Sequence, residues 1–343
     1  MVSSTQPALT SLARALAWLM VGAAFLYLIN NYLVYWRDMP GPYRLLLDLG
    51  WLGSHNEPAL SDGLRLQGWL QLSGYLLVLT MAVVYAIRFN VNSLRAESAR
   101  FQRLSAYLVR VAFWAVLLIG VIDMLISLLR IEDLLGFWVG EELVTQLGRP
   151  AFRGSVVHYP LLLVSFVLAL VFKRISFFWL ALLVVLAQFQ IVLTRFIFSY
   201  EQAFMGDLVR FWYAALFLFA SAYTLVHEGH VRVDVIYAGF SRVKKAWSNI
   251  LGSLLLGLPL CWVILMQGMG GKGNSINSPL LNFEISQSAY GLYVKYLMAG
   301  FLVVFALTMI IQFTSYLLLN LAELLEPQPD DVPDSSVAHS VLS

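Results

Sequence analysis

The chain has 343 residues, of which 60% are hydrophobic and only 12% are charged, and its formal net charge is +2. A mean hydropathy of +0.76 indicates more apolar surface than a soluble domain of this length can bury, which excludes a soluble protein. Lys and Arg are spread over the predicted loops instead of forming one basic patch, so the sequence predicts no nucleic-acid partner.

Long apolar runs, separated by clusters of charged residues, Pro and Gly, predict about eight transmembrane helices. A helix needs ~20 residues to cross ~30 Å of hydrocarbon, and the runs lack the strict alternation of barrel strands. The predicted helices cover residues 11–36, 66–89, 104–130, 156–172, 176–199, 207–228, 247–268 and 291–325. Residues 173–175 alone separate the fourth and fifth, which fits either a tight hairpin or a partly continuous helix. The expected fold class is an all-α polytopic membrane helix bundle.

Basic residues divide the predicted loops into two sets, which indicates an orientation. One alternate set is basic, with Glu97 and Asp234 as its only acids: Arg88, Arg95, Arg100, Arg103, Lys173, Arg174, Arg232, Arg242, Lys244 and Lys245. Acids accompany the basic residues of the other set. Because Lys and Arg near span ends stay on the cytoplasmic side, the basic set is expected there, together with both termini.

Composition also divides the chain near residue 175. Long outer loops with Gly and Pro are expected in residues 1–174, and short connections in the four helices of residues 175–326. We therefore expect two modules in one membrane, the first being an N-terminal membrane extension of about four helices. Residues 327–343 are polar and rich in Pro and Asp, too poor in apolar side chains to offset the entropy of ordering, and are predicted to be disordered.

The segment from His227 to Lys245 is polar, basic and patterned, and lies between two predicted spans. Four of its apolar residues follow the i, i+3, i+4, i+7 spacing of a helix face: Val233, Ile236, Tyr237 and Phe240. This predicts an amphipathic helix on the cytoplasmic interface, with basic residues available to lipid phosphate. A strand-like alternation over residues 231–235 is the competing interpretation, but no other strand is in view for it to pair with.

His227 and His230 are the candidate metal or haem ligands. A zinc-protease helix places its two His four residues apart, whereas these are three apart, so that arrangement is excluded. Two interpretations remain. In one, the two His, Glu228 and Arg232 satisfy one another's hydrogen bonds at a helix end. In the other, the chain is a multi-span redox or metal protein that uses the two His as ligands. His158 is expected at the opposite membrane face, so a site shared with it is not predicted. The sequence predicts no cofactor.

Polar residues inside the predicted spans are candidates for function, because burying them in a membrane is costly. Asp123 lies in the third span, where a carboxylate at mid-membrane costs ~2.5–3.5 kcal/mol on insertion scales. It is expected either to pair with Arg130 near the outer end or to serve a proton or ion. Gln188, Gln190 and Thr194 in the fifth span are expected to form hydrogen bonds between helices.

Several sequence runs between residues 176 and 325 together resemble a known family. They are Leu193–Phe198 (LTRFIF), Asp207–Trp212 (DLVRFW), Tyr223–Asp234 (YTLVHEGHVRVD), Ser278–Pro279 and Tyr293–Tyr296 (YVKY). This region resembles the small (Q, or DctQ-like) membrane subunit of tripartite ATP-independent periplasmic (TRAP) transporters. The family usually has two consecutive acids where this chain has Gly206 and Asp207. The first 170 residues have no counterpart in the short four-helix members.

The resemblance implies a scaffold subunit of a secondary transporter in the bacterial inner membrane, not an enzyme. In such a transporter a periplasmic binding protein delivers an organic acid, such as a dicarboxylate, to a large membrane (M) subunit that carries it across with sodium. The implied partners are these two proteins and membrane lipid. The residues expected at the partner interface are Arg195, Asp207, Arg210, His227, Glu228, His230, Arg232 and Asp234.

Overall fold

A computed structural model describes residues 6–53, 58–89, 93–173, 178–226, 235–285 and 291–326. Within these ranges the regular structure is helical throughout, with no strand. Eight of the helical stretches are long and apolar enough to cross a membrane. The predicted all-α polytopic bundle is therefore confirmed.

The first half of the chain contributes four spans and several short outer helices. They are α1 (Gln6–Tyr35), α2 (Gly41–Asp48), α3 (Asp62–Val84) continued by the π-helix η1 (Tyr85–Phe89), α4 (Leu94–Ile131), α5 (Leu135–Val139), α6 (Glu141–Leu147), α7 (Pro150–Arg153), the π-helix η2 (Gly154–His158) and α8 (Tyr159–Val171). The segment from α7 to α8 runs as one span, with η2 as its π-helical turn.

The second half contributes the other four spans. They are α9 (Phe178–Phe198), α10 (Ala203–Val226), α12 (Arg242–Gly252) continued through the π-helix η3 (Ser253–Gly257) into α13 (Leu258–Met269), and α15 (Lys295–Leu325). Two short helices lie outside the spans: α11 (Val235–Ala238) and α14 (Asn277–Asn282).

The observed helices differ from the predicted ones mainly at their polar ends. Helix α4 begins ten residues before the predicted start, because its first turns are polar and were assigned to a loop. The Ser93 hydroxyl accepts a hydrogen bond from the Ala96 amide at 3.2 Å, which caps that start. Helix α8 ends at Val171 with Phe172 in an extended conformation, so it does not continue into α9.

The expected interfacial helix is only partly formed in the described residues. Helix α11 covers Val235–Ala238, and the chain turns at Gly239 and Phe240 before Ser241 precedes α12. A helix through Phe240 was therefore a wrong prediction. The amphipathic helix at this end of the bundle is instead α12, which is continuous with a span.

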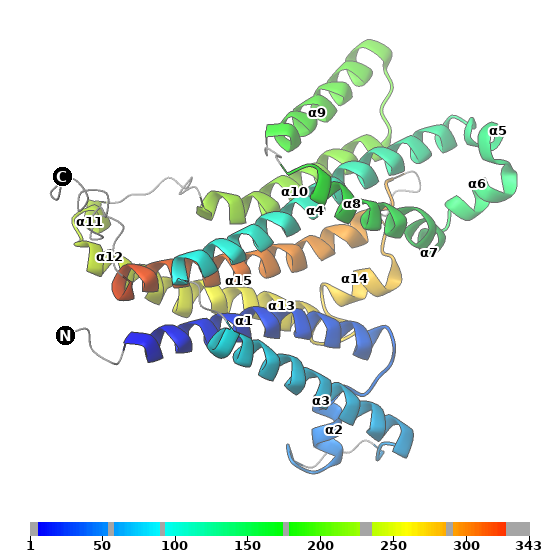
Figure 1. Cartoon of the computed structure of the whole chain (residues 1–343). Helices are drawn as coiled ribbons and strands as arrows, with labels where there is room; N and C mark the ends of the chain where they lie inside the picture. The colour runs from blue at the N-terminus through cyan, green and yellow to red at the C-terminus, as the bar shows by residue number, and fades with distance from the viewer. Residues whose placement is uncertain are drawn as a thin grey trace, which may run out of the picture.

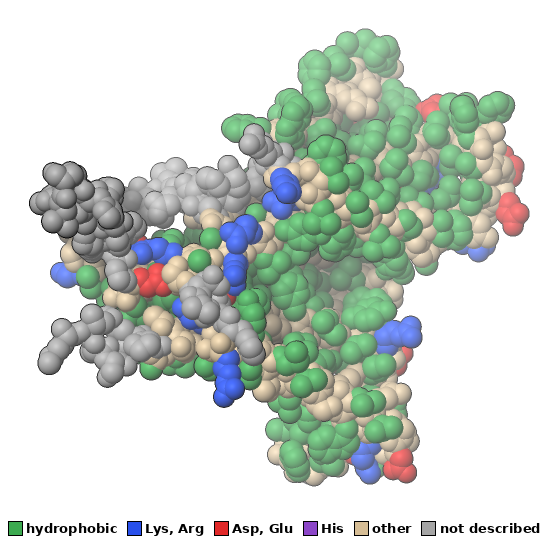
Figure 2. Space-filling view, in the orientation of Figure 1, with side chains coloured by type: hydrophobic (Ala, Val, Ile, Leu, Met, Phe, Trp, Pro, Cys, Tyr) green, Lys and Arg blue, Asp and Glu red, His purple; other side chains and the backbone are tan. Residues whose placement is uncertain are grey.

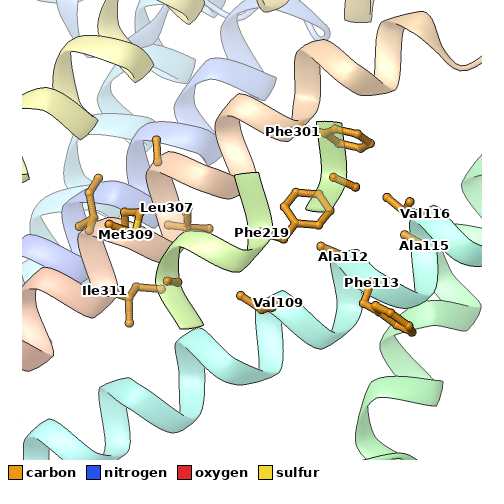
Figure 3. Packing of buried hydrophobic residues seen from close by; sticks show 14 of the residues in the cluster. Val109, Ala112, Phe113, Ala115, Val116, Phe219, Phe301, Leu307, Met309 and Ile311 are labelled. Atoms are coloured by element: carbon orange, nitrogen blue, oxygen red, sulfur yellow. The ribbon is translucent and has the colours of Figure 1, made fainter. Parts of the chain in front are cut away.

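Helix α15 is the central element of the bundle, surrounded by α4, α10, α13 and α1 (Figure 1). In Figure 3, Phe219 of α10 lies between Ala112 of α4 and Phe301 of α15, and the Phe219 and Phe301 ring centroids are 5.0 Å apart. Lipid tails are as apolar as these side chains, so close packing and hydrogen bonds, not the hydrophobic effect, hold membrane helices together. Helices α3 and α9 lie at opposite edges, where α3 packs on α1 and α2, and α9 packs mainly on α10.

The start of α1 and the end of α15, which lead to the two termini, lie at the same end of the bundle (Figure 1). In the space-filling view, Lys and Arg side chains gather around this end. Most of the Asp and Glu side chains visible in the same view lie at the opposite end (Figure 2). Assignment of the first end to the cytoplasm stays a prediction.

Candidate functional site

A group of buried polar residues lies where the first half of the chain meets the second, toward the end opposite the termini. We call it the junction cluster: Asp123 and Ser127 of α4, Arg153 of α7, His158 of η2, and Tyr293 and Tyr296 at the start of α15. All six residues are buried, and Asp123, Arg153 and His158 are fully buried. Charged side chains at such positions need partners.

Asp123 receives three hydrogen bonds. Nη1 of Arg153 donates to its Oδ1 at 3.0 Å, and Nε2 of His158 is 3.1 Å from the same oxygen. The backbone N–H of Tyr293 donates to Oδ2 at 2.8 Å. Three donors on one carboxylate, one of them a guanidinium, compensate the loss of hydration.

Arg153 is held from several sides. Its Nε donates to the Leu147 carbonyl at 2.8 Å, and its Nη1 also lies 3.2 Å from the hydroxyl oxygen of Ser127. The guanidinium carbon is 3.9 Å from the centre of the Tyr293 ring, which is within cation–π range. Helix α7 starts at Pro150, whose fixed φ suits a first helical position, and this short helix positions Arg153 beside Asp123.

His158 connects the acid to the second half of the chain. Because Asp123 can only accept when ionised, Nε2 of His158 is assigned as the donor, and Nδ1 then accepts from the Tyr296 hydroxyl at 2.8 Å. The His158 and Tyr296 rings are also nearly parallel, with centroids 5.8 Å apart. Both ring nitrogens are thus used inside the protein.

Arg130 pairs with Tyr293, which corrects the expected Asp123–Arg130 pair. Nη1 of Arg130 donates to the Tyr293 hydroxyl at 2.9 Å, and that hydroxyl donates to the Gly148 carbonyl at 3.0 Å. Spacing along α4 predicted the wrong cation because the partner of Asp123 is not on α4. Arg153 lies 30 residues further along the chain and is brought to the carboxylate by the tertiary fold.

The chemistry of the junction cluster is that of a structural link. Its charges compensate one another, and each of its tyrosines contacts a different part of the first half. Removing one partner of a buried pair leaves an uncompensated charge, which costs ~3–5 kcal/mol. The cluster therefore fixes the start of α15 against α4 and α7.

None of the predicted interface residues that the structure describes belongs to this cluster, although Asp207 bonds to the residue that precedes Tyr293. Asp207 is mostly buried, and its Oδ2 accepts from the Leu292 amide at 3.1 Å while its Oδ1 lies 3.2 Å from Nη1 of Arg210. The Arg210 side chain is exposed. At the end of α9, Nε of Arg195 lies 3.4 Å from a carboxylate oxygen of Glu201, and both side chains are exposed.

The other five predicted interface residues, His227, Glu228, His230, Arg232 and Asp234, lie outside the described residues, so a ligand role for His227 and His230 is not tested. Among the residues that the structure does describe, no three His, Cys, Asp or Glu side chains form a group that could hold a metal ion.

An apolar cavity of about 360 Å³ lies between α4, α8, α10 and α15. Its lining includes Phe166, Phe211, Phe301 and Val304, and its few polar groups come from residues such as Thr308 and Tyr296. An organic anion needs cationic or amide donors at its binding site, and this lining has no charged side chain. The cavity suits hydrocarbon, not an organic acid.

Fold and site together define a polytopic membrane protein whose buried charges link helices to one another. Within the second half of the chain, residues 181–323 match the model for the DctQ component of the tripartite ATP-independent periplasmic transporters. The chain thus carries a DctQ domain, formed by α9 to α15, and this component is the small membrane subunit of such a transporter. No curated protein and no solved structure matches the chain.

Sequence reasoning missed Arg153, His158, Tyr293 and Tyr296 as members of one cluster. Arg153 falls outside the predicted span of residues 156–172, and His158 was considered only as a haem or metal ligand. The usable signal was the intramembrane carboxylate itself, because a buried acid requires a cation close in space. The identity of that cation depends on the tertiary fold.

Proposed function

We propose that this chain is the small (Q) subunit of a TRAP-type secondary transporter and braces the large membrane subunit during sodium-coupled uptake of an organic acid, such as a dicarboxylate. The observation that carries the proposal is the DctQ match over residues 181–323, which spans four membrane helices. A periplasmic binding protein that delivers the solute completes the proposed assembly.

The interior of the chain supports a bracing role. Secondary transporters bind their solute near the middle of the membrane, where broken helices present backbone and polar groups. In the described residues, the cavity between α4, α8, α10 and α15 is apolar, and the fully buried charges of the junction cluster are paired. These two features are consistent with a solute that binds to the other subunits of the transporter.

Reconstitution tests this function. The chain and the large subunit are purified together and placed in liposomes, and uptake of a labelled dicarboxylate is driven by a sodium gradient with the loaded binding protein outside. Uptake is expected only when both membrane subunits are present. Equal uptake by the large subunit alone, or uptake by this chain alone, would contradict the proposal.

We also propose that both termini face the cytoplasm of a bacterial inner membrane. The basic residues near the end of the bundle that carries the termini support this orientation. Fusions at the C-terminus test it: green fluorescent protein is expected to fluoresce there, and alkaline phosphatase is expected to be inactive. An active phosphatase fusion would reverse the orientation.

A further inference from the structure

Helix α9 is the most isolated span of the DctQ domain. It stands away from the bundle and packs mainly against α10 (Figure 1). Leu180 and Ala187 face the bundle and are buried, whereas the outward side carries large exposed side chains, such as Trp179 at 61% and Phe189 at 56% exposure. An apolar helix face alone is equally suited to lipid and to protein.

Two glutamines distinguish α9 from a lipid-facing helix. Gln188 and Gln190 lie near the centre of this 21-residue helix, and both side chains are exposed. Neither amide has a hydrogen-bond partner in the part of the chain that the structure describes. They are eight to ten residues from the helix ends, roughly 12–15 Å, so neither amide lies near the membrane surface.

Two other carboxamides of the bundle find their partners inside the chain. Gln71 of α3 is buried and accepts from the Gly41 amide at 2.8 Å, and the buried Asn320 of α15 accepts from Asn249 at 2.9 Å. Thr194 of α9 satisfies its hydroxyl on its own helix, by donating to the Gln190 carbonyl at 2.9 Å. The expected interhelical hydrogen bonds of Gln188 and Gln190 therefore have to come from another chain, because lipid tails offer neither donor nor acceptor.

The arrangement of polar groups along α9 indicates the kind of partner. At 100° per residue, Gln188 and Gln190 lie at the two borders of the outward half of the helix. Arg195 lies two turns after Gln188, on the same face as Gln188. A second copy in the same membrane would be parallel and related by a two-fold axis, which would place the two exposed Arg195 side chains at the same depth. At that depth each copy would present an Arg195 that already pairs with its own Glu201, so a contact between two copies adds no new ion pair.

We propose that the outward half of α9 is the docking surface for the large membrane subunit, which hydrogen-bonds Gln188 and Gln190 at mid-membrane and presents an acidic group near Arg195. This inference rests on the proposed function. The first half of the chain covers α15 and one side of α10, and it leaves α9 open. Docking at α9 is thus possible both for a small subunit with the N-terminal extension and for one that consists of the DctQ domain alone.

Photo-crosslinking tests the surface directly. The full chain is co-expressed with the large subunit, with Phe189→p-benzoylphenylalanine at the centre of the outward half and, as a control, Leu77→p-benzoylphenylalanine on the exposed side of α3. An adduct identified by peptide sequencing as the large subunit is expected at position 189 and not at 77. An adduct between two copies of this chain, an adduct at 77 only, or no protein adduct would overturn the proposal.

A second measurement tests the amides. The double variant Gln188→Leu, Gln190→Leu is expected to lower the affinity for the large subunit roughly tenfold, because it removes two interhelical hydrogen bonds. Gln67→Leu, an exposed carboxamide on α3, is the matched control and should leave the affinity unchanged. Equal affinity for the double variant would overturn the docking surface while the proposed function stands. If the unaltered chain itself fails to retain the large subunit, the proposed function and this inference fail together.

Discussion

Asp123 is a residue whose importance can be predicted from the sequence, although its role cannot. The sequence places a carboxylate inside a span, and the structure supplies Arg153, His158 and the Tyr293 amide as its partners. The function of the residue then follows from those partners: it joins α4 to the start of α15.

Substitution of Asp123 tests this structural role. Asp123→Leu leaves Arg153 buried without a counter-charge and is expected to lower the free energy of unfolding by ~3–5 kcal/mol. The double variant Asp123→Leu, Arg153→Met removes both charges and is expected to be more stable than the single variant, although His158 still lacks an acceptor. Thermal unfolding of the purified protein in detergent measures the difference, and a double variant that is no more stable than the single one would contradict the pairing.

Transport by the same double variant separates a structural role from a role in ion movement. Because the solute is proposed to bind elsewhere, the reconstituted complex is expected to retain sodium-coupled uptake once its assembly is verified by size-exclusion chromatography. Loss of uptake by a fully assembled complex would assign Asp123 to the transport path. Gln67→Leu serves as the reference for an unrelated substitution.

A second acid acts outside the membrane. Asp48, at the end of α2, accepts from the Leu60 amide at 2.8 Å, and Nε of Arg65 lies 3.0 Å from its other oxygen. The hydrogen bond from Leu60, together with Arg65, lowers the pKa of Asp48 below its ordinary value of 3.8. Its contribution to stability is therefore fully present above pH 3.8 and is lost as the pH falls through the lower pKa of the folded protein.

Hydrogen exchange at the Leu60 amide checks this pH dependence. Protection, corrected for the intrinsic exchange rate, is expected to be high at neutral pH and to fall once the pH drops below the folded pKa of Asp48. Asp48→Asn should reduce protection at neutral pH and remove the pH-dependent step. Unchanged protection across the transition would show that the carboxylate does not hold this loop.

At the scale of elements, the eight spans were predictable because each depends on local composition and length. Their polar ends were not: the first turns of α4 are charged, and their burial depends on contacts with other segments, such as the hydrogen bond of 2.6 Å from Trp18 to Glu97. The small outer helices α2, α5, α6 and α14 are too short to give a periodic signal. The junction cluster was unpredictable because it depends on contacts between distant segments.

Packing between α4 and α10 depends on one small residue. A Cβ at Gly120 of α4 would lie 2.6 Å from Nε1 of Trp212 on α10, a ring whose N–H donates to the Val116 carbonyl at 3.3 Å. Gly120→Ala is therefore expected to lower the free energy of unfolding by ~1–3 kcal/mol through overpacking. Gly74→Ala on α3 meets nothing within 4 Å, and it is expected to stabilise by ~0.5–1 kcal/mol because alanine favours the helix. Thermal unfolding that ranks these variants the other way round would contradict the α4–α10 packing.

For the whole molecule, helices from the two halves of the chain pack against each other along the bundle. Near the termini the hydroxyl of Ser98 donates to the Ser315 carbonyl at 2.8 Å, and Arg95 lies 3.4 Å from Glu323. At the opposite end the junction cluster links the two halves. A separate hydrogen bond there runs from Asn31 of α1 to the Met269 carbonyl of α13, at 2.6 Å. The N-terminal extension is thus fastened to the DctQ domain at both ends of the bundle.

Cleavage between the halves tests this attachment. A protease site inserted between residues 173 and 178 lets the folded, purified chain be cut after its helices have assembled. Because polar contacts and packing join α4 and α1 to α15, the two fragments are expected to elute together from a size-exclusion column in mild detergent. The same cut in a chain carrying Asp123→Leu should weaken the association, since the substitution damages the junction cluster, which is one of the polar links between the halves. Separation of the fragments in the unaltered sequence would mean that the extension is held by the connecting segment alone, and the rigid attachment would be wrong.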